Sequence, residues 1–149
     1  MNISLLLQMA ADTDPDRIGV VCDGRRWSYG TLFNAAKGAA ELFVASGCSH
    51  VALQDESSAA APIALFGAAL AGIPYVPLNY RLADVDLGAL LDRIAPAYVI
   101  GDAERVNRLS SGHTVHTRDE FVASAEAAAE TASGDEREGE GIAAQIFTS

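Results

Sequence analysis

Hydrophobic residues follow two patterns that alternate along this chain. Short apolar runs, which are typical of buried strands, occur within 50–55, 74–78 and 97–102. Between these runs, apolar residues recur every three or four positions, which is typical of a helix with one buried face. In 30–46 they are Phe33, Ala36, Ala40 and Phe43. This alternation of strands and helices predicts an α/β fold, with a mostly parallel sheet flanked by helices.

Residues that begin and end helices mark the boundaries of these elements. Ser28 is expected to cap the helix at 30–46, and Gly47 is expected to end it. Asp84 is expected to cap a helix whose apolar side includes Leu87 and Leu91. The other predicted elements are an amphipathic helix within 1–14, a helix that ends at Gly72, a short helix at 103–109, a strand around Val115 and an Ala-rich helix at 119–131.

The pattern at 18–29 predicts an antiparallel hairpin. Two β-rich runs, at 18–22 and 27–29, flank Asp23-Gly24, a dipeptide favoured in tight two-residue turns. The chain is therefore expected to form an incomplete N-terminal domain. Its predicted parts are the hairpin at 18–29, an alternating α/β region at 30–131, an acidic linker at 132–141 and a strand at 142–149 that leads into a loop.

Composition narrows the expected partners and compartment. The chain has 149 residues, half of them hydrophobic, which is enough for one domain with a buried core. Its net charge of −10 argues against a nucleic-acid partner, because binding phosphates requires clustered Lys and Arg. The acidic run at 134–141 is expected to be solvated. Cys22 and Cys48 lack a metal or redox spacing, so reduced thiols and a cytoplasmic location are expected.

An uncharged stretch at 59–78 has about the length that a bilayer requires. It contains Pro62, Pro74 and Pro77 and is rich in Ala rather than Leu or Ile. A buried helix followed by a short strand fits this composition better, so no transmembrane segment is predicted. The N-terminus has no Lys or Arg before its apolar residues, so no signal peptide is predicted either.

Several common catalytic motifs are absent from the sequence. It contains no GxGxxG after a strand, no GxxxxGK[ST], no GxSxG and no HExxH. His50, His113 and His116 are interpreted as structural. Parallel sheets bind ligands beyond the carboxyl ends of their strands. The loops expected to bind ligands therefore follow Asp55, Leu78, Asp102 and Phe147.

Three segments together resemble the adenylate-forming superfamily, which includes acyl-CoA synthetases, aryl-CoA ligases, peptide-synthetase adenylation domains and luciferases. They are WSYGTL at 27–32, ALAGIPYVPLNYRL at 69–82 and IFTS at 146–149. The resemblance covers essentially the whole chain, as the first part of the large N-terminal domain. PLNYRL is more similar to the acyl- and aryl-CoA ligase branch than to the peptide-synthetase domains. Thr31 stands where the family often has Glu, and the segment GCSHVALQDESS is shortened.

The resemblance implies a two-step reaction of ATP with a carboxylic acid, for which a fatty or aromatic acid is expected. An acyl-adenylate and pyrophosphate form first, and the thiol of coenzyme A then displaces AMP. It also implies that Thr148 and Ser149 are the first hydroxyls of the phosphate-binding loop, which acts with Mg²⁺, and that Asn79, Tyr80 and Arg81 lie near the channel for coenzyme A. No catalytic residue or metal ligand is expected within the 149 residues.

The chain alone is therefore expected to be inactive and to need the remainder of the same polypeptide downstream of Ser149. A homodimer is a further expected assembly. Two alternatives remain open at this stage. One is an adenylation domain that loads the thiol of a carrier protein, and the other is a non-catalytic α/β interaction module.

Overall fold

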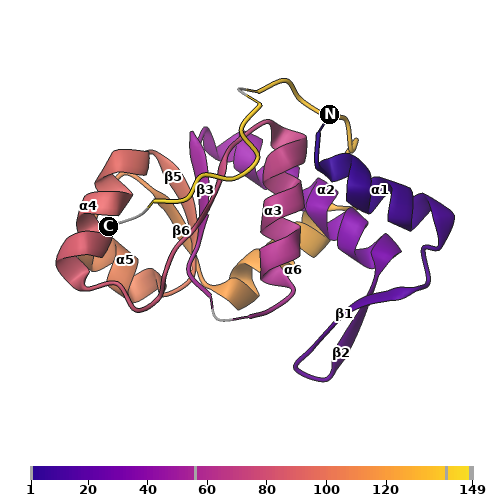
Figure 1. Cartoon of the computed structure of the whole chain (residues 1–149), viewed down its shortest axis with the longest axis horizontal. Helices are drawn as coiled ribbons and strands as arrows, with labels where there is room; N and C mark the ends of the chain where they lie inside the picture. Colours follow the sequence, from indigo (N-terminus) through magenta and orange to yellow (C-terminus); the bar gives the residue numbers. More distant parts are fainter. Residues whose placement is uncertain (1, 56, 140, 148–149) are drawn as a thin grey trace.

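A four-stranded parallel sheet forms the centre of the computed structural model, which describes residues 2–55, 57–139 and 141–147 (Figure 1). Its strand order is β4-β3-β5-β6. The strands are β3 (His50–Leu53), β4 (Tyr75–Pro77), β5 (Ala97–Ile100) and β6 (Thr114–His116). β3 pairs with β5 over its whole length and with β4 from Val51 to Leu53, so it occupies an interior position. The predicted α/β class with a mostly parallel sheet is confirmed.

Helices cover both faces of this sheet, as Figure 1 shows. α2 (Tyr29–Ser46), α3 (Ala60–Ala71) and α6 (Arg118–Ala128) pack on one face, and α4 (Asp84–Ile94) and α5 (Ala103–Leu109) pack on the other. Side chains alternate along each strand, so Val51 and Leu53 join the first core whereas Ala52 joins the second. α1 (Ser4–Thr13) packs on α2 and α3.

The predicted hairpin consists of β1 (Ile18–Cys22) and β2 (Arg25–Ser28), paired antiparallel. Asp23 and Gly24 both have positive φ, 50° and 76°, as a turn of the primed type requires. Trp27 of β2 is 3% exposed and packs within the hydrophobic core, which anchors the hairpin. Arg25 lies 3.6 Å above the Trp27 ring and binds both carboxylate oxygens of Glu126 on α6, at 2.8 and 2.9 Å.

Some helix boundaries agree with those predicted from the sequence, and others differ from them. The Ser28 hydroxyl accepts the Thr31 amide and caps α2, as predicted. Asp84 is not a cap: it is the first residue of α4, and Ala83 precedes it without a side-chain cap. α6 begins at Arg118, one residue before the predicted start, because Thr117 and Glu120 form a reciprocal capping box.

The three helices on the first face approach one another closely through glycine. A Cβ at Gly38 on α2 would lie 1.9 Å from the Ala125 carbonyl oxygen of α6. A Cβ at Gly67 on α3 would lie 2.8 Å from the Ala39 Cβ of α2. Phe43 fills the space beneath, stacked on Phe121 at 5.7 Å between ring centres. Glycine at 38 and 67 therefore allows α2 to lie in close contact with α6 and α3 in this core.

The acidic segment at 132–141 is mostly exposed where it is described, but it is not detached from the domain. The Arg137 amide donates to the Leu70 carbonyl oxygen at 2.8 Å, and the Arg137 side chain pairs with Glu41 at 3.3 Å. The Gly139 backbone crosses that of Gly72 so closely that a Cβ at Gly139 would lie 2.1 Å from the Gly72 oxygen. The segment is therefore a solvated strap across α2 and the end of α3.

The segment after this strap lies along the outer edge of β4. Ala144 forms a parallel bridge with Tyr75, and the Gln145 amide donates to the Tyr75 oxygen at 2.8 Å. The sequence predicted a strand at 142–149. Among the described residues of that range, the structure shows this isolated bridge instead. No helix among the described residues is long and apolar enough to cross a membrane.

The contact at Gly38 generates a stability prediction. Gly38→Ala should lower the free energy of unfolding by about 2 kcal/mol or more, because α6 must move away from α2. Gly88→Ala is the matched control, since Gly88 is also helical and a Cβ there meets its nearest atom at 3.5 Å. That variant should gain about 0.5–1 kcal/mol. Urea unfolding of both variants measures the difference, and equal effects would contradict the packing described.

Candidate functional site at the carboxyl edge of the sheet

The carboxyl ends of three neighbouring strands surround a cavity of about 290 Å³. Gln54 and Asp55 follow β3, Tyr80 follows β4 and Asp102 follows β5, and Arg105 completes the lining. Three of the four loops expected to bind ligands, those after Asp55, Leu78 and Asp102, therefore meet at one place. The fourth, after Phe147, lies outside the described residues. This edge is the candidate functional site.

The turn after β4 contains the three residues predicted to lie near a coenzyme A channel. The Asn79 side-chain oxygen accepts the Arg81 amide at 2.9 Å and so shapes the turn. The Arg81 guanidinium lies 5.5 Å from the centre of the Tyr80 ring. Tyr80, 43% exposed, lines the cavity, whereas Asn79 and Arg81 do not. Contact of these residues with coenzyme A stays a prediction.

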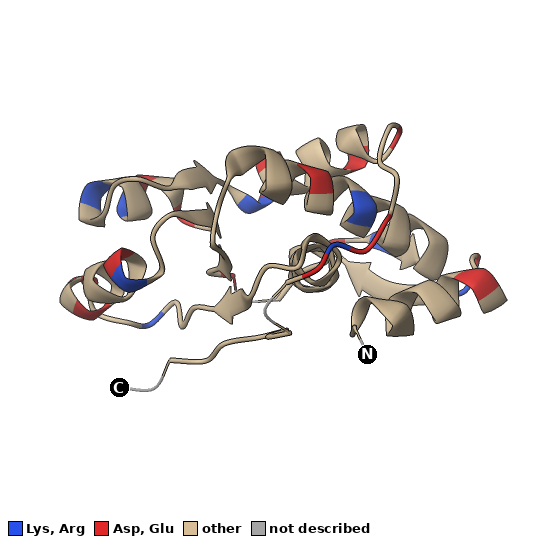
Figure 2. Ribbon diagram, turned by 90° about the horizontal axis from the view of Figure 1, so that it is seen from above, with Lys and Arg blue, Asp and Glu red and all other residues tan. Residues whose placement is uncertain are grey.

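Arg105 on α5 holds this turn in place and was not predicted from the sequence. Its Nε donates to the Asp84 carboxylate at 2.8 Å, and its two terminal nitrogens donate to the carbonyl oxygens of Tyr80 and Leu82. Arg108 binds the other Asp84 oxygen at 3.0 Å. The hydrogen bonds from Arg105 and then Arg108 lower the pKa of Asp84 below its usual value. Figure 2 shows acidic and basic residues close together on these helices.

Gln54 enters the cavity from the end of β3. Its amide donates to the Ile100 oxygen at 2.8 Å, which extends the β3–β5 pairing by one residue. Gly101 has a φ of 152°, and a Cβ there would lie 2.6 Å from the Gln54 carbonyl oxygen. Gln54 itself is 7% exposed. The packing of these two backbones therefore requires glycine at 101 and fixes the point from which the Gln54 side chain begins.

Asp55, next in sequence, is tied to two other elements. Its carboxylate accepts the Ser58 hydroxyl just before α3 and lies 3.5 Å from the Arg118 guanidinium on α6. The Asp55 side chain is 11% exposed. The carboxylate of Asp102 accepts the Arg105 amide at 3.0 Å and caps α5. Both acidic groups of the cavity thus have structural partners as well as a face toward the cavity.

A second polar cluster, at the other end of β5, contains Ser110, His113 and Asp92. The Ser110 hydroxyl lies 2.9 Å from Nε2 of His113 and 2.7 Å from the Asp92 carboxylate. Nδ1 of His113 accepts the Ala97 amide at 3.1 Å, so the ring proton of the neutral form sits on Nε2. The imidazole then donates to Ser110 and cannot take its proton. This arrangement opposes nucleophilic catalysis and supports the structural interpretation of His113.

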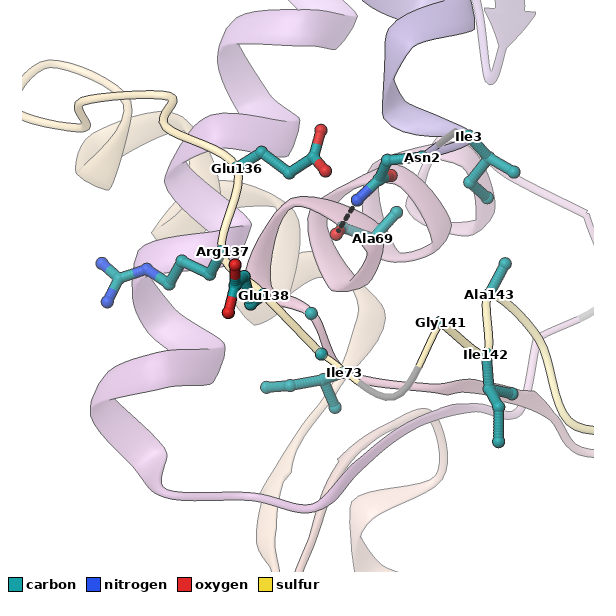
Figure 3. Close-up of a pocket in the computed structure, with 12 residues that line it drawn as sticks. Asn2, Ile3, Ala69, Ile73, Glu136, Arg137, Glu138, Gly141, Ile142 and Ala143 are labelled. Carbon is teal, nitrogen blue, oxygen red and sulfur yellow. Dashed lines mark hydrogen bonds between the residues drawn. The ribbon is translucent and has the colours of Figure 1, made fainter.

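Another cavity, of about 480 Å³, lies between α1, the end of α3 and the strap (Figure 3). Two of its polar side chains, Asn2 and Arg137, have protein partners. Asn2 donates to the Ala69 oxygen at 2.8 Å, and Figure 3 shows Arg137 directed away from Ile142 and Ala143. Glu136 and Glu138 also line it, and the remaining lining is aliphatic or backbone. Two carboxylates on one exposed segment repel each other and any anion, so this cavity is a weaker candidate for a ligand site than the carboxyl edge of the sheet.

The predicted phosphate-binding residues, Thr148 and Ser149, lie outside the described residues. Across 2–55, 57–139 and 141–147, no group of three or more His, Cys, Asp or Glu is arranged to hold a metal ion. The binding of Mg²⁺ and of the phosphates of ATP by this loop stays a prediction.

Comparison with known families identifies the chain. The model of the AMP-binding enzyme family matches residues 7–149. The chain belongs to this family of adenylate-forming enzymes. No curated protein matches the sequence. The resemblance inferred from three short segments is thus confirmed at the level of the family, while the branch within it is not resolved.

Solved structures share the fold with this member of the family. VinN in complex with 3-methylaspartate superimposes with a TM-score of 0.84 at 20% identity, covering 100% of this chain and 44% of VinN. ATP-bound MatB from Rhodopseudomonas palustris gives 0.74 at 26% identity, covering 99% and 32%. A benzoate CoA ligase from Burkholderia xenovorans LB400 gives 0.72 at 21%, covering 83% and 28%. The chain spans less than half the length of these proteins.

The contacts of Arg105 predict a local effect. Arg105→Ala should increase backbone hydrogen exchange at 80–82, because the carbonyl oxygens of Tyr80 and Leu82 lose their donor. Arg108→Ala is the control, since Arg108 contacts Asp84 but neither carbonyl. Equal exchange at 80–82 in both variants would show that Arg105 does not hold the turn.

His113 predicts a dependence of stability on pH. Burial lowers the pKa of His113 below its ordinary value of 6.5, so folding favours the neutral ring. Its contribution to stability is present above pH 6.5 and is lost as the pH falls through the lower pKa of the folded state. Urea midpoints at pH values on either side of this window should differ less for His113→Gln than for wild type. Ser111→Ala, at an exposed position of the same turn without a titratable group, is the control and should retain the wild-type difference.

Proposed function

We propose that this chain is the first part of the large domain of an acid–thiol ligase. The complete enzyme would join a carboxylic acid to ATP, giving an acyl-adenylate and pyrophosphate, and would then pass the acyl group to the thiol of coenzyme A. The observation that carries this proposal is the family match over residues 7–149. ATP-bound MatB and the benzoate CoA ligase, whose folds are similar, support the choice of cosubstrates.

Adenylation solves a chemical difficulty of the acid. A carboxylate resists attack by a thiol because its charge is delocalised and oxide is a very poor leaving group. Transfer of AMP to the acid provides a stable leaving group. The protein must stabilise charge on phosphate oxygens during this transfer, which amides and hydroxyls of a loop can do together with Mg²⁺. In this proposal the hydroxyls of Thr148 and Ser149 begin that loop.

The edge of the sheet supports a partner in the remainder of the same polypeptide. Ile142 and Ile146 are 45% and 73% exposed, and they flank the segment that pairs with β4. The outer edge of this segment presents backbone N–H and C=O groups, which native proteins usually pair or cover. A fatty or aromatic acid is the proposed substrate class, which the described residues do not themselves select.

The proposal predicts how activity depends on the length of the chain. Residues 1–149 alone should show no carboxylate-dependent exchange between ATP and pyrophosphate, whereas a polypeptide that continues into the rest of the family domain should show it with an acid from a fatty and aromatic panel. Exchange by residues 1–149 alone, or none from the longer polypeptide, would contradict the proposal.

The thiol acceptor separates the branches. Free coenzyme A and a phosphopantetheinylated carrier protein should be offered in parallel to the longer polypeptide, with thioester formation measured by mass spectrometry. We expect product with coenzyme A. Product with the carrier alone would favour a carrier-loading domain, and absence of adenylation as well would favour a non-catalytic module.

A further inference from the structure

The side-chain oxygen of Gln54 is buried without a hydrogen-bond donor. Gln54 is 7% exposed, and the structure shows no partner for its Oε1 in the part of the chain that it describes. An amide oxygen removed from water without a donor costs free energy, and folded proteins avoid this at most positions. Gln54 lines the cavity at the carboxyl edge of the sheet, so a bound group can supply the missing donor.

The other charged groups of the cavity disfavour an anionic ligand. Asp55 and Asp102 both line it, and carboxylates repel another carboxylate or a phosphate. Arg105 is the cation of the lining, but its three side-chain nitrogens already donate to Asp84 and to the carbonyl oxygens of Tyr80 and Leu82. An anion would therefore have to displace these hydrogen bonds.

A cationic ligand would have to compete for the carboxylates of this cavity of about 290 Å³, because Asp55 already accepts the Ser58 hydroxyl and Asp102 already accepts the Arg105 amide. The Asp55 carboxylate also has the Arg118 guanidinium 3.5 Å away. What the cavity offers is an acceptor without a donor, the Oε1 of Gln54, among charged groups that already have protein partners. A neutral group with an N–H donor satisfies Gln54 without adding a net charge.

We propose that this cavity binds a neutral secondary amide, whose N–H donates to Oε1 of Gln54. The site itself stands on the geometry of the cavity, and only the source of the amide rests on the proposed function. Of the three reactants of an acid–thiol ligase, the thiol carries secondary amides in its arm, whereas ATP and a simple carboxylic acid do not. Coenzyme A and a carrier protein present the same arm, so Gln54 does not distinguish them.

Titration of isotopically labelled residues 1–149 with pantetheine tests the site by NMR. Pantetheine should shift the backbone signals of 54–55, 80–82 and 101–102 saturably. ATP, propionate, propylammonium and 2-mercaptoethanol should not, because the first two are anions, the third is a cation and the last has no N–H. N-methylacetamide should shift the same signals as pantetheine, only more weakly.

Gln54→Leu is the decisive variant, since leucine has a similar size and no acceptor. It should weaken pantetheine binding about tenfold, the effect of one hydrogen bond to a buried group. It should also raise the melting temperature of the unliganded chain, because an unsatisfied buried oxygen is removed. Gln8→Leu, at an exposed position of α1, is the matched control and should leave binding unchanged.

Equal pantetheine binding by wild type and Gln54→Leu, no binding by wild type, or equal binding of propionate or propylammonium would overturn the inference. A lower melting temperature of Gln54→Leu would also count against an unsatisfied oxygen. Amide binding through Gln54 in a chain whose longer polypeptide ligates no thiol would leave the site in place and refute the proposed function. If the longer polypeptide ligates a thiol equally well with and without Gln54→Leu, the proposed function would stand and the amide site would be refuted.

Discussion

The candidate site depends on the position of β3, which is hydrogen-bonded along both edges, to β4 and to β5. Parallel neighbours end at the same side of a sheet, so residues far apart in sequence meet where these strands stop. Both faces of β3 are covered, because Val51 and Leu53 lie in one core and Ala52 in the other. Gln54 therefore projects from one of the most constrained points of the molecule, and the turn after β4 is held against it by Arg105.

The elements that the sequence predicted well are those whose hydrophobic period is clear. The runs that became β3, β4 and β5 are largely apolar because helices cover both faces of the sheet. The end of the chain was harder to predict from its period. An apolar run at 142–147 has the composition of a strand, yet pairing requires a neighbour, and among the described residues β4 provides it at Ala144. The composition of a segment does not show whether a neighbouring strand is available to pair with it.

The polar residues of the site were only partly predictable. The rule for parallel sheets indicated the loops after Asp55, Leu78 and Asp102, and these loops do line one cavity. Arg105 was missed because its role depends on Asp84 and on two carbonyl oxygens that come close only when α4 and α5 pack side by side. Its spacing from Arg108 places both on one helical face, a signal that a charge-pattern search could have used.

The crossing of Gly72 and Gly139 has a consequence for how this fold can vary. The chain between the end of α6 and Arg137 is mostly exposed, so added residues there can loop into solvent. Between Gly139 and the bridge at Ala144 the path is fixed at both ends, by backbone contact on one side and by β4 on the other. Related chains should therefore differ in length before this crossing and keep the same length after it.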